Sequence, residues 1–96
     1  MKTTTKRQMI KLLREIQRLQ ADYFHIGLFF TISLIPCDKT SRNIRSIYVS
    51  IHKKEETASC YSIYNFSSYE ENLQIIKTIK DKINTIINAE QLQTSN

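Results

Sequence analysis

The stretch of sequence that decides the fold runs FHIGLFFTISLIP, from Phe24 to Pro36. Apolar side chains recur there at every second position, and a period of two is typical of a β-strand. We therefore expect a long strand over residues 24–35 that ends at Pro36. One face of this strand is formed by Phe24, Ile26, Leu28, Phe30, Ile32 and Leu34.

The residues before this stretch repeat with a different period. Apolar side chains recur three and four positions apart, which is the spacing of one face of an α-helix. Thr3, Thr4 or Thr5 can cap such a helix at its N-terminus. The pattern predicts an amphipathic helix over about residues 4–22, with an apolar face made of Met9, Leu12, Leu13, Ile16, Leu19 and Tyr23.

Two further strands are predicted after the polar turn that follows Pro36. Residues 43–53 place Ile47, Val49 and Ile51 on one face. Residues 57–66 are rich in tyrosine and β-branched residues, which favour strands. Their pattern does not decide which side chains of this strand point inward. The inward set is either Cys60, Tyr64 and Phe66, or Tyr61 and Ile63.

A second helix is predicted over about residues 68–89. It begins at two overlapping capping boxes, Ser67 with Glu70 and Ser68 with Glu71. A wide apolar arc then makes it a main contributor to the core, whereas the polar residues 91–96 are expected to form a frayed tail. The arc consists of Tyr69, Leu73, Ile76, Ile79, Ile83, Ile86 and Ile87.

These segments predict a single α+β domain over residues 1–96, in the order α-β-β-β-α. Short connections between the strands favour a three-stranded antiparallel meander. Each helix has one apolar face to bury, so both helices are expected to pack on one face of the sheet. The other face is then left open.

The composition excludes several enzyme classes. With one Gly and one Pro, the chain lacks the glycines of a Walker loop, a dinucleotide fingerprint or a nucleophile elbow. No two of the histidines and cysteines are separated by the short spacing that metal ligands usually have. We therefore expect no bound metal. We also expect no cofactor and no enzymatic activity. The enzymatic alternative is a small ribonuclease-type toxin, whose catalytic groups would be Arg45, Tyr48, His52 and Tyr61.

The formal charge of +5 belongs to the first predicted helix. Residues 1–18 hold six basic residues against the single acid Glu15, and the remaining residues hold eight basic and eight acidic ones. At 100° per residue, Arg7, Lys11, Arg14 and Arg18 fall within an arc of about 60°, nearly opposite the apolar face. Such a row is either an ordinary solvated face or a binding surface for a polyanion.

The first functional hypothesis is binding to nucleic-acid phosphates through this helix. Like charges three and four residues apart repel each other, so a helix face that served stability alone would contain more acids between them. Three of the four cations are arginines, whose guanidinium groups are suited to binding phosphate. Double-stranded-RNA-binding domains share the predicted order of elements, but Glu70 and Glu71 stand where their second helix begins with lysines. We expect the predicted turns to extend the contact through Lys39, Arg42, Arg45, Lys53 and Lys54.

The second hypothesis is a protein-binding inhibitor or adaptor of the phage or mobile-element type. It would dock on a host protein by the basic helix or by the open sheet face, which also offers a homodimer surface. On that face we expect Phe29, Tyr48 and His52, together with Tyr61 or Tyr64.

The apolar stretch beginning at Phe24 is too short to span a bilayer, and no small-residue cleavage site follows it. We therefore expect a cytoplasmic protein with no membrane partner. Cys37 and Cys60 are expected to be reduced thiols in that compartment.

Overall fold

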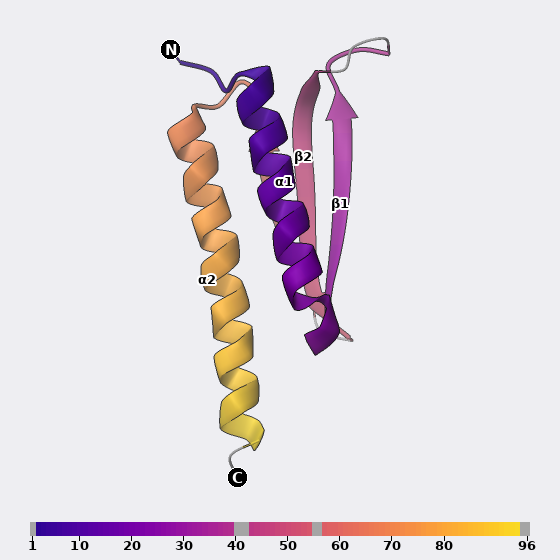
Figure 1. Ribbon diagram of the computed structural model, residues 1–96, viewed down its shortest axis with the longest axis vertical. Helices are drawn as coiled ribbons and strands as arrows, with labels where there is room; N and C mark the ends of the chain where they lie inside the picture. Colours follow the sequence, from indigo (N-terminus) through magenta and orange to yellow (C-terminus); the bar gives the residue numbers. More distant parts are fainter. Residues whose placement is uncertain (1, 40–42, 55–56, 95–96) are drawn as a thin grey trace.

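The elements of the computed structural model follow the predicted order (Figure 1). The structure describes residues 2–39, 43–54 and 57–94, and side chains as far as residue 89. Two helices and a three-stranded antiparallel sheet confirm the predicted α+β fold class. The elements are α1 (Lys6–Tyr23), a single 3₁₀ turn η1 (Phe24–Ile26), β1 (Leu28–Pro36), β2 (Ile44–Lys53), β3 (Ser59–Tyr64) and α2 (Tyr69–Thr94).

The sheet has the order β1-β2-β3, and both helices lie against the same face of it (Figure 1). Helix α1 packs against β1, β2 and α2, while α2 packs against β3. Every element contributes to one apolar core between the helices and the sheet. Its fully buried members are Met9, Leu12, Ile16, Leu19, Leu28, Phe30, Ile47, Val49, Ile51, Ile63, Ile76, Ile79 and Ile83.

Both long helices begin at a side-chain cap. Thr5 caps α1, because its hydroxyl accepts a hydrogen bond from the backbone N–H of Gln8 and the Gln8 side chain accepts one from the N–H of Thr5. This reciprocal pair satisfies two backbone donors that the first helical turn leaves free. At the start of α2, the Ser68 hydroxyl accepts a hydrogen bond from the N–H of Glu71 at 3.1 Å.

A buried polar cluster joins the two helix starts. The Asn72 side chain is fully buried in α2, and its Nδ2 donates to the Thr4 hydroxyl at 2.8 Å and to the Tyr64 carbonyl at 2.9 Å. Thr4 in turn donates its hydroxyl proton to the Ser67 carbonyl at 2.7 Å. Because buried polar groups are costly without partners, this cluster fixes the segment before α1 to the end of β3.

The first strand begins later than the sequence pattern predicts. Phe24 and Ile26 lie in η1, and Gly27 ends that turn with φ +85°. The left-handed backbone at Gly27 redirects the chain into the sheet, so β1 starts at Leu28. Phe24 therefore lies 69% exposed outside the sheet instead of on its inner face. The apolar residues of the turn continued the period of two only by coincidence.

The ambiguous face of the third strand is resolved by its pairing with β2. Ile63 is paired with Ile47 and Tyr61 with Val49, so Tyr61 and Ile63 point toward the helices. Tyr64 consequently points to the open side. The second helix is also longer than predicted: residues 91–94, expected in a frayed tail, belong to α2. The last two residues of that tail lie outside the described part of the chain.

Candidate functional site

Helix α1 carries a row of exposed cations along the side opposite its core residues. We call Arg7, Lys11, Arg14 and Arg18 the cation face. The row extends over twelve residues, and the eleven steps from Arg7 to Arg18 cover about 16 Å along the helix axis. Within the described residues, no acidic side chain forms an ion pair with any of the four. The cation face therefore presents four positive charges to solvent without an ion-paired acid among the described residues.

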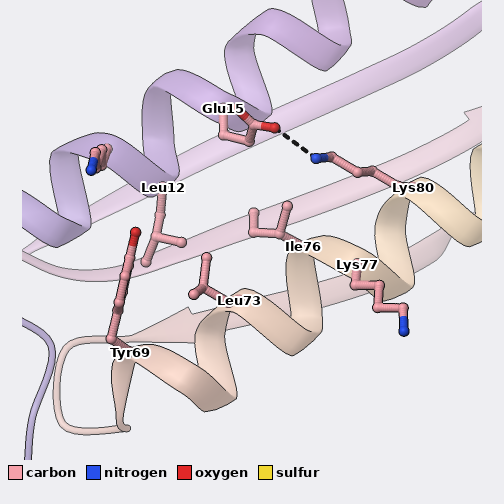
Figure 2. Close-up of a pocket in the computed structure, with 8 residues that line it drawn as sticks. Leu12, Glu15, Tyr69, Leu73, Ile76, Lys77 and Lys80 are labelled. Atoms are coloured by element: carbon pink, nitrogen blue, oxygen red, sulfur yellow. Dashed lines mark ion pairs between the residues drawn. The ribbon is translucent and has the colours of Figure 1, made fainter.

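The acid expected to offset this row is engaged elsewhere. From the sequence, Glu15 is the one acid within reach of Lys11 and Arg18. In the structure its carboxylate instead contacts the Lys80 ammonium of α2 at 2.8 Å (Figure 2). The hydrogen bond from Lys80 is the main cause that lowers the pKa of Glu15 below its ordinary value of 4.5, with a smaller charge effect from Arg18. Glu15 thus forms its ion pair with α2 and keeps only a weaker charge interaction with Arg18 of the cation face.

A groove between α1 and α2 borders the cation face. Figure 2 shows Leu12, Tyr69, Leu73 and Ile76 converging on it, with the Glu15–Lys80 pair at one end. Its volume is about 310 Å³. Lys11 lines the groove from α1 and Lys77 from α2, and the ammonium of Lys77 points away from the apolar floor. The positive surface therefore continues from α1 onto α2.

The sequence analysis did not predict that Lys77 and Lys80 of α2 lie beside the cation face. One signal was present: Lys80 lies inside the apolar arc of the helix, between Leu73 and Ile83 when the positions are projected at 100° per residue. A lysine placed inside an apolar arc indicates an acid on the element opposite, and Glu15 is that acid.

The remaining basic residues predicted for the same contact do not all lie together. Lys39 and Lys54 lie in turns at the two ends of β2, a strand of ten residues, which separates them by about 30 Å. Lys53 ends that strand. Arg45 lies at a bulge near the other end, where the register shifts between Ile35 and Pro36. Arg42 lies outside the described residues.

The sheet face that no helix covers carries aromatic residues in two groups. Phe29 stacks on His52 with ring centroids 5.3 Å apart. At the other end, Tyr64 contacts Tyr48 edge to face at 6.1 Å and stacks on Phe66 at 4.8 Å. The predicted outward positions of Phe29, Tyr48 and His52 agree with this register.

Tyr61 must be removed from the predicted sheet interface. It is paired with Val49 and packs partly buried against the core, on the side of the helices. Tyr64 takes its place on the open side, because side chains alternate along a strand.

The groups considered for a ribonuclease-type site do not converge. Tyr61 lies on the opposite face of the sheet from Tyr48 and His52. Arg45 and His52 are seven residues apart along β2, or about 23 Å. Among the described residues, no cluster of His, Cys, Asp and Glu is arranged to hold a metal ion, and Cys37 and Cys60 are both free thiols.

No family model, curated protein or solved structure matches this chain. In the described part of the chain, neither helix combines the length and apolar character needed to cross a membrane. The two surfaces described above are therefore the basis for assigning a function.

Proposed function

We propose that the protein binds the phosphate backbone of a nucleic acid through the cation face of α1. The observation that carries this proposal is the exposed row of Arg7, Lys11, Arg14 and Arg18, with no ion-paired acid among the described residues. A row about 16 Å long is matched to about four successive phosphates of one strand.

Helix stability alone does not account for this row. The pairs Arg7–Lys11 and Arg14–Arg18 are four residues apart, and each like-charge pair costs a few tenths of a kcal/mol. Arg7 also lies in the first turn of α1, where positive charge opposes the helix dipole. A ligand that supplies negative charge removes both penalties. The arginines add bidentate hydrogen bonds to phosphate oxygens.

Such a surface gives affinity without sequence readout. Contacts to phosphates position a protein on its nucleic acid, whereas base edges carry the specificity. We therefore expect similar affinity for unrelated sequences and a steep dependence on salt. The protein would act as a binding module with no catalytic step.

The direct test is a fluorescence-polarisation titration at about 50 mM salt, the low end of the range in which such contacts are strong. The probes are a labelled duplex and a labelled single strand of random sequence. Changing all four residues of the cation face to glutamine is expected to weaken binding at least about 100-fold. Glutamine is a good helix former, so the variant should melt at or above the wild-type temperature.

A charge-matched control separates the cation face from overall charge. It replaces four other basic residues by glutamine: Lys39, Arg45, Lys54 and Lys82. This control should lose only a small part of the affinity. Equal losses in the two variants, or wild-type protein that binds neither probe, would overturn the proposal. In the second case an acidic protein surface becomes the alternative partner for the same cations.

A further inference from the structure

The open side of the sheet is a second surface with a different chemistry. We define the open sheet face as the outward side chains of β1, β2 and β3 together with the adjacent Phe66. No Asp, Glu, Lys or Arg occupies an outward position in the paired registers of the three described strands. The members are Phe29, Thr31, Ser33, Ile35, Ser46, Tyr48, Ser50, His52, Cys60, Ser62, Tyr64 and Phe66.

Large apolar side chains of this face are exposed. Phe66 is 57% exposed, Phe29 51%, Ile35 38% and Tyr48 36%. The two helices lie on the other side of the sheet (Figure 1), so no described element covers them. Exposed aromatic groups at both ends of a sheet face that no described element covers indicate an interaction site.

We propose that the open sheet face binds a second copy of this chain. Each copy carries a net charge of +5, concentrated on α1 behind the sheet, so face-to-face docking keeps the two cation faces as far apart as the fold allows. The outward positions in the paired registers carry no charge, and Arg45 at the bulge lines a hollow at one end of the face with Ile35 and Tyr48. An acidic or basic partner would have to bury charges over the rest of the face without a counter-ion. Hydroxyl groups such as those of Ser50 and Tyr48 both donate and accept hydrogen bonds. Two copies of the face can therefore form hydrogen bonds with each other.

The available area fits a small dimer. The chain exposes 6921 Å², whereas a folded monomer of its mass exposes about 5,700 Å². Three strands spaced about 4.8 Å apart give a face that buries on the order of 1,000 Å² from two copies, at the lower limit for specific interfaces. A dissociation constant in the micromolar range is the expected consequence.

The dimer has a defined arrangement of layers. Two sheets stack about 10 Å apart with their strands roughly aligned. With a twofold axis that lies between the two faces and perpendicular to the strands, the Tyr48–Tyr64–Phe66 end of one copy meets the Phe29–His52 end of the other. The helices are then outermost. If the proposed function holds, the two cation faces point in opposite directions and the dimer can hold two nucleic-acid segments.

Sedimentation velocity of the full chain, without nucleic acid, tests the dimer over about 1–200 μM, a range that brackets a micromolar constant. We expect a concentration-dependent dimer. Phe29→Lys should weaken it roughly 30-fold, as for a buried aromatic contact. The matched control is Phe24→Lys, which places the same substitution at an exposed phenylalanine outside the sheet and should leave the dimer unchanged.

A wild-type monomer at the highest concentration would overturn the proposal. A dimer that persists equally in Phe29→Lys would also overturn it, because the copies would then pair elsewhere, through the edge of β1 or the end of α2. If circular dichroism shows that Phe29→Lys is unfolded, Phe66→Lys takes its place, since Phe66 lies outside the strands. The measurement contains no nucleic acid, so its outcome is independent of the proposed function.

Discussion

The cation face of α1 and the open sheet face are opposite in almost every physical property. The first is a row of four exposed charges on a helix, and the second has aromatic and hydroxyl side chains with no charge at its outward strand positions. Both surfaces lie on a single small core, one on each side of it. This fold therefore places a charged surface and an aromatic, uncharged one on opposite sides of one core.

Secondary-structure propensity explains the residue types of the two surfaces but not their patterns. Lysine and arginine are good helix formers, and tyrosine and phenylalanine are good strand formers. Propensity does not require four cations in one arc without acids between them. It also does not require Phe29 and Tyr48 to be exposed. These two patterns are what the proposed contacts explain.

The largest expected change in stability comes from the polar cluster that holds the two surfaces on one scaffold. Replacing Asn72 by alanine removes its hydrogen bonds to the Thr4 hydroxyl and the Tyr64 carbonyl, although both groups keep a hydrogen bond with Ser67. It also leaves a small cavity where the Asn72 side chain is fully buried. We expect unfolding free energy to fall by about 2–3 kcal/mol, measured by urea denaturation. Asn88→Ala, at an exposed position on the same helix, is the control and should change stability by less than about 0.5 kcal/mol.

Asn72→Ala also tests whether the buried polar cluster affects only the stability of the fold and neither of the two surfaces. Below its melting temperature the variant should retain both nucleic-acid affinity and self-association. Wild-type stability in this variant would show that the buried cluster does not hold α1 in place.

A smaller loss of stability is expected from substitution of Gly27, which lies between η1 and β1. Its φ of +85° is unfavourable for other residues, and no atom lies within 4 Å of an added Cβ. Gly27→Ala should therefore cost about 1 kcal/mol through backbone strain alone. Gly27→Asn should cost less, because asparagine tolerates this conformation better. Equal stability of all three proteins in urea would contradict the left-handed turn.

The smallest effect concerns the ion pair beside the cation face. Lys80 lowers the pKa of Glu15 in the folded protein, so the pair stabilises the fold above pH 4.5, and this contribution disappears as the pH falls below the lowered pKa. Both side chains are more than a third exposed, so solvent screening limits the effect to a few tenths of a kcal/mol. Glu15→Gln should lower the melting temperature slightly at pH 7 and leave it unchanged at pH 2.

The same variant sharpens the comparison of the two surfaces. Removing Glu15 frees Lys80 and takes a negative charge away from the cation face. Nucleic-acid binding should then strengthen a few-fold, while self-association through the open sheet face remains unchanged. Weaker binding in Glu15→Gln would contradict the role of Glu15 as the acid that limits this surface.

The core and the order of elements could be predicted because they follow from periodicity. Met9, Leu12 and Ile16 at helical spacing and Ile47, Val49 and Ile51 at strand spacing are all buried. The start of β1 could not be predicted from the period alone, because Phe24 and Ile26 fit it while Gly27 breaks the strand. The face of β3 depended on its pairing partner, since both of its faces carry aromatic residues.

For the candidate surfaces too, the features that follow from local spacing could be predicted, whereas those that depend on contacts between elements could not. Local spacing on one helix placed all four residues of the cation face together, since helical neighbours need no tertiary information. The ion pair between Glu15 and Lys80 joins residues 65 positions apart, and the separation of Lys39 from Lys54 depends on the sheet. The sequence left the choice between Tyr61 and Tyr64 for the open side undecided for the same reason. Contacts between elements were the part that local patterns did not contain.

The most direct test of the central claim is the salt dependence of nucleic-acid binding. Affinity for a labelled duplex is measured between about 50 and 200 mM salt for the wild type and for the variant with glutamine at all four cation-face positions. Four phosphate contacts predict a slope of log affinity against log salt of about −3 to −4, or roughly a 100-fold loss over this range. The variant should have a slope near zero. A wild-type slope that persists in the variant would contradict the account, because the phosphates would then be bound elsewhere.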